Sequence, residues 1–130
     1  LLKENGLKDD DGKQHDTKQT LSMWNSPPVL IIALKRFSFD GRKNNRRVQF
    51  PLKDLSINKH ISGYQNKKKY TLYGVCNHSG VTNGGHYTSF VRVKNGNWYL
   101  FNDMTVSLVT NIEQNIISPK AYVLFYRLQE

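Results

Sequence analysis

The residues of this chain best suited to chemistry are His86 and Asn102, sixteen positions apart, with Asp103 directly after Asn102. The histidine follows Gly84-Gly85 and opens an apolar segment, and a second apolar segment ends at Asn102. If these segments are neighbouring strands, they bring an imidazole and an amide or carboxylate to one end of a sheet. Such a partner fixes the tautomer of the imidazole, so its other nitrogen can take a proton from a thiol. The spacing predicts the base and orienting residue of a catalytic triad.

Cys76 is the only cysteine, and therefore the only thiol that the chain could contribute as a nucleophile. It stands among Leu72, Tyr73 and Val75, which is the setting of a buried and inert thiol. A reactive cysteine needs a helix N-terminus or a neighbouring cation to stabilise its thiolate. We therefore expect Cys76 to be structural. A single cysteine also excludes an internal disulfide, which suits a reducing compartment.

The sequence shows no pattern for a metal or a cofactor. Its four histidines have no paired ligand spacing, and no Cys-x-x-Cys is present. There is no Walker-type or dinucleotide-binding glycine loop. We expect neither a metal site nor a cofactor.

Length and composition limit the class of protein. A chain of 130 residues is enough for one domain with one modest core. Hydrophobic content of 38% and aromatic content of 12% are typical of a globular chain. No apolar run is long enough to span a bilayer, and the N-terminus is too polar for a signal peptide. We expect an intracellular protein of the cytoplasm, the nucleus or both, without a membrane partner.

The net charge of +9 comes from the middle of the chain, where residues 35–69 hold eleven Lys and Arg against two Asp. Two clusters, at 42–47 and 67–69, could bind nucleic acid phosphates. Neither cluster is interleaved with aromatic residues, and neither lies on an amphipathic helix. The pattern favours two solvated loops, and we do not expect nucleic acid as a partner.

Alternation and β-branched content predict an α+β, β-rich domain of mainly antiparallel strands with short helices. The expected strands are residues 29–37, 48–50, 70–77, 86–93, 97–102 and 121–128. Residues 29–37 form a continuous apolar run, which favours a strand buried on both faces. Residues 52–61 favour a helical turn, and residues 1–20 favour a loop or frayed lead-in.

The turn at Asn95-Gly96 decides which residue meets His86, because successive residues of a strand point to opposite faces. A two-residue loop pairs Lys94 with Asn97 and puts Asp103 on the face of His86.

A three-residue loop with Gly96 as a left-handed bulge residue pairs Val93 with Asn97 instead. Thr88 then opposes Asn102, and His86 lies diagonal to Asn102 within reach of its side chain.

The chain resembles the C-terminal part of a ubiquitin-specific protease catalytic domain, a papain-like cysteine deubiquitinase. The matching motifs follow the order of the family and cover about residues 20–128. They are Pro27-Pro28-Val29-Leu30-Ile31-Ile32-Ala33-Leu34-Lys35-Arg36-Phe37, Val48-Gln49-Phe50-Pro51-Leu52, Asn77-His78-Ser79-Gly80, Gly84-Gly85-His86-Tyr87-Thr88-Ser89, Trp98-Tyr99-Leu100-Phe101-Asn102-Asp103 with Val106, and Ala121-Tyr122-Val123-Leu124-Phe125-Tyr126.

The resemblance implies a role for each site residue. His86 matches the general base, Asn102 the third triad position, and Asp103 an accessory or substitute acid. The family pattern requires the register with a bulge at Gly96, so we predict Asn102 as the orienting residue. Residues 78–85 match a mobile loop beside the channel for the C-terminal Gly-Gly tail of ubiquitin. Substrate-binding residues would then be His78, Gly84, Gly85 and Tyr87.

The resemblance also implies that half of an active site is missing. The family carries its nucleophilic cysteine and oxyanion donor upstream, in a thumb subdomain that this chain lacks, and the chain matches the antiparallel palm sheet. Residues 1–20 match the end of the zinc-binding fingers region but hold no cysteine, so a metal-free region is expected. Residues 21–130 match the palm.

Two functions follow from this resemblance. In the first, the parent protein is a deubiquitinase that cleaves the bond after the Gly-Gly tail, with ubiquitin and the thumb segment as partners. The 130-residue chain alone would be inactive. In the second, the chain is a non-catalytic ubiquitin-binding module.

Overall fold

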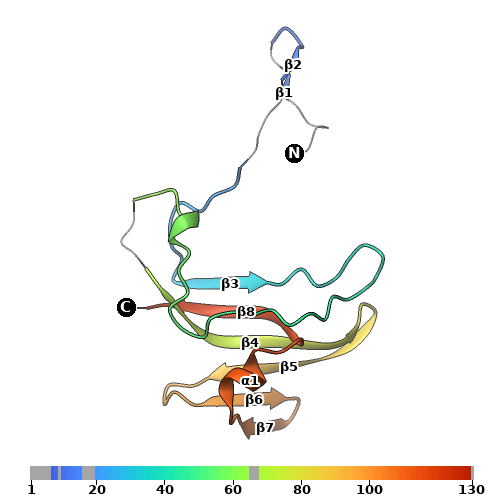
Figure 1. Ribbon diagram of the computed structural model, residues 1–130, viewed down its shortest axis with the longest axis vertical. Helices are drawn as coiled ribbons and strands as arrows, with labels where there is room; N and C mark the ends of the chain where they lie inside the picture. Colours follow the sequence, from blue (N-terminus) through green and yellow to red (C-terminus); the bar gives the residue numbers. More distant parts are fainter. Residues whose placement is uncertain (1–6, 9, 16–19, 65–67, 130) are drawn as a thin grey trace.

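The computed structural model describes residues 7–8, 10–15, 20–64 and 68–129 (Figure 1). The strands are β1 (Leu7–Lys8), β2 (Gln14–His15), β3 (Val29–Ala33), β4 (Tyr70–Val81), β5 (Gly84–Arg92), β6 (Trp98–Asn102), β7 (Thr105–Leu108) and β8 (Ala121–Leu128). A 3₁₀ helix, η1 (Asn58–His60), and an α-helix, α1 (Ile112–Ile116), complete the described elements. None of the described helices is both long and apolar enough to cross a membrane.

Six strands form one antiparallel sheet in the order β3-β8-β4-β5-β6-β7, and β1 pairs only with β2. This arrangement confirms the β-rich, antiparallel fold expected from the sequence. The strand over residues 121–128 is found at the predicted bounds, and η1 supplies the helical turn predicted within residues 52–61.

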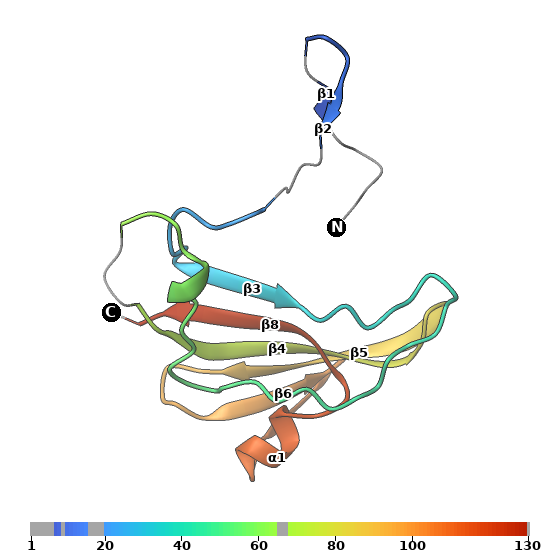
Figure 2. The ribbon, with the colours of Figure 1, turned by 45° about the horizontal axis from the view of Figure 1, so that its top comes forward.

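The core lies on one face of this sheet, under the segment 50–61 and α1 (Figures 1 and 2). Tyr70 and Tyr126 are completely buried there, and each hydroxyl donates a hydrogen bond of 2.8 Å to a backbone carbonyl, of Pro27 and Pro51 respectively. Burial raises the pKa of Tyr126 to about 12. Each such bond satisfies a polar group that would otherwise be costly to bury. The two tyrosines tie the loops before β3 and after residue 50 to the sheet.

The opposite face carries apolar side chains that stay exposed in this chain. Ile31 on β3 is 59% exposed, and Val106 and Leu108 on β7 are 54% and 57% exposed. The expectation of a strand over 29–37 buried on both faces was wrong in two respects. The strand ends at Ala33, and one of its faces is open, because Val29 and Ile31 are 43% and 59% exposed. It lies at the edge of the sheet, where β8 is its one partner among the described strands. Nothing among the described residues forms a layer over this face.

Three other expectations differ from the structure. Residues 48–50 form no strand, and they are not part of either sheet. The polar lead-in contains the short β1–β2 hairpin, which turns at Gly12 with a φ of 76°. The strand β7 was not predicted, although Thr105-Val106-Ser107-Leu108 alternates polar and apolar residues.

Gly84 and His86 lie at the end of the sheet where the β4–β5 hairpin turns. In both views the tip of this hairpin lies beside the loop that follows β3 (Figures 1 and 2). The segment 34–50 therefore meets the same sheet end as Gly84 and His86, although it lies about forty residues earlier in the chain.

Candidate functional site

The turn between β5 and β6 sets the register on which the site depends. Val93 N–H donates to the Asn97 carbonyl at 3.0 Å, and Gly96 N–H donates to the Val93 carbonyl at 2.9 Å. Gly96 has a φ of 90°, a left-handed conformation that favours glycine. The ladder continues through Arg92–Trp98 to Ser89–Phe101. The three-residue loop predicted from the sequence is confirmed, and the two-residue alternative is excluded.

This register brings His86 and Asn102 into contact. Nε2 of His86 lies 2.5 Å from Oδ1 of Asn102. Because Oδ1 can only accept a hydrogen bond, the contact requires the hydrogen of the neutral imidazole to be on Nε2. Nδ1 then keeps its lone pair and can accept a proton. The pair has the geometry of a base and its orienting residue.

Asp103 also approaches the imidazole, although a straight strand would send it to the other face. The strand β6 ends at Asn102, which pairs with Thr105 across a two-residue turn, and Asp103 has a φ of 50° in this turn. Its Oδ2 lies 3.9 Å from Nε2 of His86, and the two side chains are 77% and 50% exposed. Water screens a pair at this distance and exposure, so the contact with Asp103 is much weaker than the hydrogen bond with Asn102.

The residues expected to form a loop, 78–85, are instead a paired hairpin. The β4–β5 ladder begins at Gly74–Val91 and continues through His78–Tyr87 to Val81–Gly84, which leaves Thr82 and Asn83 in the turn. His78 pairs with Tyr87 in this ladder, so it belongs to a strand rather than to an open loop. The backbone N–H and C=O groups of the hairpin are hydrogen-bonded within the sheet.

His78 is 3% exposed and lies among aromatic rings. Its ring centroid is 4.7 Å from that of Tyr87, 5.4 Å from that of Phe37 and 6.2 Å from that of Tyr122. Burial lowers the pKa of His78, and the nearby Lys43 lowers it further. The structure therefore keeps this imidazole neutral and uses it as a packing surface.

Of the other expected substrate residues, Tyr87 and Gly85 lie against this ring, and Gly84 does not. Tyr87 is 56% exposed, so a ligand can reach part of its side chain. A Cβ on Gly84 would meet no atom within 4 Å, whereas a Cβ on Gly85 would overlap the His78 ring and the Ser79 carbonyl. Gly84 thus leaves open space at the surface, and Gly85 permits the close packing of His78.

Sequence reasoning missed Arg36 and Lys43, which fix the loop after β3 beside this cluster. The buried Arg36 guanidinium donates from Nε to the Ala121 carbonyl at 2.6 Å and from Nη1 to the carbonyls of Asn44 and Arg46 at 2.8 and 2.9 Å. Nζ of Lys43 donates to the His78 carbonyl at 2.6 Å. The sequence did contain a signal for Arg36. An arginine at the end of an apolar run can be buried, and a buried guanidinium must be hydrogen-bonded.

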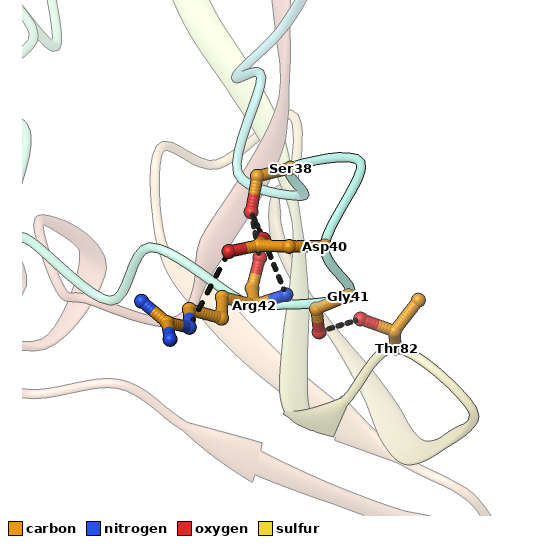
Figure 3. Close-up of polar contacts among 5 residues, drawn as sticks. All are labelled: Ser38, Asp40, Gly41, Arg42 and Thr82. Carbon is orange, nitrogen blue, oxygen red and sulfur yellow. Dashed lines mark hydrogen bonds and ion pairs between the residues drawn. The ribbon is translucent and has the colours of Figure 1, made fainter.

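The tip of this loop touches the hairpin turn (Figure 3). The Thr82 hydroxyl donates to the Gly41 carbonyl at 2.5 Å. Within the loop, the Ser38 hydroxyl bonds Asp40 and the Arg42 carbonyl, and Nε of Arg42 lies 3.3 Å from the Asp40 carboxylate. These contacts hold the loop 38–42 against the β4–β5 hairpin.

Cys76 does not belong to the site. It pairs with Ser89, three ladder positions from the pair formed by Ser79 and His86, which is roughly 10 Å along the strand. Its side chain is partly buried, and burial raises the pKa of the thiol. An activated thiol needs the opposite shift. In the described part of the chain, no group of three or more His, Cys, Asp or Glu side chains could hold a metal ion.

Comparison with known proteins gives matches in both sequence and structure. A sequence model of the family described as ubiquitin carboxyl-terminal hydrolase matches residues 5–126. Ubiquitin carboxyl-terminal hydrolase 15 of Bos taurus is 42% identical over 122 residues, which cover 90% of this chain and 12% of that protein. Ubiquitin carboxyl-terminal hydrolase 19 of Homo sapiens is 40% identical over 130 residues, which cover 88% of this chain and 10% of that protein.

A solved structure shares the fold. The SAGA DUB module of Ubp8, Sgf11, Sus1 and Sgf73 bound to monoubiquitin contains a chain that matches with a TM-score of 0.83 and 29% identity. The match covers 99% of this chain and 30% of that one. The chain thus spans about a tenth of the length of the curated relatives that it matches. The motifs, the antiparallel sheet and these matches together show that the chain belongs to the ubiquitin carboxyl-terminal hydrolase family of deubiquitinases.

Proposed function

We propose that this chain supplies the general base, His86, and its orienting residue, Asn102, to a cysteine deubiquitinase that acts inside the cell. The observation that carries the proposal is the 2.5 Å contact between Nε2 of His86 and Oδ1 of Asn102. It leaves Nδ1 as the nitrogen that faces a nucleophile.

In this reaction Nδ1 of His86 takes the proton of a cysteine thiol supplied by another segment. The thiolate adds to the carbonyl carbon of the last glycine of ubiquitin, and the carbonyl oxygen becomes negatively charged. When the carbon–nitrogen bond breaks, the imidazolium gives its proton to the leaving amine, and an acyl-thioester remains. Water, deprotonated by the same imidazole, then hydrolyses the thioester and restores the thiol.

The nucleophile must come from outside the described residues. Cys76 is the only cysteine of the chain, and its position and raised pKa exclude it from this role. The relatives are about ten times longer than the matched segment, which leaves ample chain for a thumb segment with the catalytic cysteine. We propose such a segment as the partner that completes the site.

Ubiquitin is the proposed substrate, and its tail would pass over the open side of Gly84 and Tyr87. Two observations support this path: no atom of the described residues lies within 4 Å of a Cβ on Gly84, and Tyr87 is 56% exposed. The match to a chain solved in a complex with monoubiquitin supports ubiquitin as the ligand.

A non-catalytic ubiquitin-binding module is the second candidate, favoured by the lack of a usable thiol in the chain. Both candidates predict ubiquitin binding, but only the first predicts that His86 matters for turnover. Since the contact of His86 with Asn102 has no evident use in a binding module, the first candidate is preferred.

The test compares the chain alone with the chain plus a thumb segment from a relative, using a fluorogenic amide of the ubiquitin C-terminus. We expect no turnover by the chain alone, because a base without its thiolate cannot form the acyl intermediate. Turnover should appear with the thumb segment and should be lost with His86→Ala. The control variant is His60→Ala, which removes an exposed histidine outside the site.

Two results would contradict the proposal. One is turnover by the chain alone that disappears with Cys76→Ser. The other is a complemented enzyme whose turnover is the same with His86→Ala as with His60→Ala.

A further inference from the structure

A second concave surface lies far from His86, at the opposite end of the sheet. It is an open cavity of about 660 Å³ beside the β5–β6 turn and the end of β8. Arg92, at the end of β5, is six residues from His86, which corresponds to about 20 Å along a strand. The cavity is therefore separate from the proposed active site. We call it the basic groove, and its described lining residues are Thr71, Tyr73, Val91, Arg92, Val93, Lys94, Gly96, Arg127, Leu128 and Gln129.

The cations of the basic groove come from two different parts of the chain. Arg92 ends β5, Lys94 lies in the turn that follows, and Arg127 lies near the end of β8. None of the described lining residues is acidic, and no described ion pair joins these three side chains to a carboxylate. Three positive charges around one cavity favour an anionic ligand.

Two of these cations are held in place by the protein. Cζ of Arg127 lies 5.0 Å from the centroid of the Tyr73 ring, a cation–π geometry. Nε of Arg92 donates to the Gly96 carbonyl at 3.4 Å, which ties its guanidinium to the turn. A held guanidinium loses less conformational entropy on binding a carboxylate, which it can bind through two parallel N–H bonds.

The surface between the cations is apolar. Val91, Val93 and Leu128 line the cavity, and Val93 is 36% exposed. Apolar area inside a ring of cations fits a ligand that alternates carboxylates with aliphatic or aromatic side chains. We propose that the basic groove binds an acidic peptide segment of a partner protein, with an apolar side chain on the floor and carboxylates on Arg92 and Arg127.

Nucleic acid fits the basic groove less well. Single strands bind by stacking bases on exposed aromatic rings along a line of cations. Tyr73 is the one aromatic residue among the described lining residues, and the Arg127 guanidinium already lies over its ring. The three cations surround a cavity rather than following a strand.

The experiment measures binding to the full 130-residue chain by fluorescence anisotropy. The probe is a fluorescein-labelled peptide of Glu and Leu residues. The same peptide with every Glu replaced by Gln, and single-stranded DNA of matched net charge, are the comparison ligands. We expect the Glu peptide to bind, its affinity to fall as salt rises, and the Gln peptide and the DNA to bind at least about tenfold more weakly.

The variant Arg92→Gln/Arg127→Gln should weaken Glu-peptide binding by about fivefold or more, since two exposed charge pairs are lost. The matched control is Arg42→Gln/Arg47→Gln, which removes the same charge from the loop after β3 and should change affinity by less than about twofold. Circular dichroism checks that both variants keep the fold. Peptide titration followed by NMR should shift the amide signals of Val91, Val93 and Gly96.

Several results would overturn the proposal. The first two are undetectable binding of the Glu peptide and an equal loss of affinity in the two double variants. The others are NMR shifts centred on residues 42–47 and DNA binding as tight as that of the Glu peptide.

Discussion

The ring of His78 fills the space where a side chain on Gly85 would lie, and this contact shapes the hairpin that carries His86. A Cβ built on Gly85 overlaps Nε2 of His78 and the Ser79 carbonyl. The neighbouring Gly84 has no atom within 4 Å of the same position. The two glycines therefore have different roles, although they are adjacent in the sequence.

Gly85→Ala should lower the free energy of unfolding by about 1–3 kcal/mol, because the buried His78 ring has little room to move. Gly84→Ala, the matched control, should change it by less than about 0.5 kcal/mol. Urea denaturation of the two variants measures the difference. Equal stability of the two variants would show that the His78 ring yields easily.

Gly96→Ala should destabilise the chain by about 1–2 kcal/mol, since a φ of 90° is strained for any residue with a Cβ. It should also move Asn102 away from His86, because the bulge at Gly96 sets the register of β6. Gly41→Ala is a control for strain alone, since Gly41 has a φ of 78° and open space around it. The imidazole NMR signals of His86 should change with Gly96→Ala only, and unchanged signals would contradict the proposed dependence on the turn.

In the complemented enzyme, Asn102→Ala should reduce kcat about a hundredfold or more, because the imidazole loses the acceptor that fixes its tautomer. Asp103→Ala should reduce kcat by less than about tenfold, since its exposed carboxylate lies 3.9 Å away and is screened by water. Steady-state kinetics with the fluorogenic amide compares the two variants. A larger loss for Asp103→Ala would reassign the orienting role.

Acid should destabilise the chain through His78. In the folded chain the pKa of His78 is lowered from its usual value of 6.5, mainly by burial and further by the charge of Lys43. The unfolded chain therefore binds this proton more readily, and the contribution to stability is lost as the pH falls from about 6.5 through the lowered folded pKa. Urea denaturation at pH 7.5 and in mild acid should show a decrease that is smaller in His78→Gln than in the control His60→Gln. Equal decreases would rule out His78 as the source.

Ile31→Thr should reduce self-association of the chain without unfolding it, because Ile31 is 59% exposed on the uncovered face of the sheet. Leu124→Thr on the covered face, where Leu124 is 2% exposed, should cost about 2–5 kcal/mol instead. Sedimentation velocity and thermal denaturation measure the two effects. A wild-type chain that stays monomeric at high concentration would contradict the first expectation.

The register of β5 against β6, which brings His86 to Asn102, could be predicted from the sequence. Asn95-Gly96 marked the turn, and the family pattern selected the three-residue loop, which the Val93–Asn97 pairing confirms. The strand 121–128 was predicted at its observed bounds because it is a short run rich in aromatic and branched apolar residues, which favours a strand.

The remaining differences have physical causes. Asn77-His78-Ser79-Gly80 is typical of a loop, yet these residues continue β4 because β5 pairs with them and aromatic rings bury His78. After Ala33 the Leu34 N–H still donates to the Tyr122 carbonyl, and then the Arg36 side chain, rather than the backbone, bonds the Ala121 carbonyl of β8 and the Asn44 carbonyl of the following loop. Both outcomes depend on residues far away in the sequence, which local patterns do not report.

The position of β3 at the sheet edge has a consequence for synthesis on the ribosome. Val29 pairs with Arg127, almost a hundred residues later, and β8 is the one partner of β3 among the described strands. At translation rates of about 5–20 residues per second, the apolar strand Val29–Ala33 waits roughly 5–20 s for its partner. A nascent chain of this segment thus emerges with an unpaired, aggregation-prone strand, and its folding rate is limited by the closure of a very long loop.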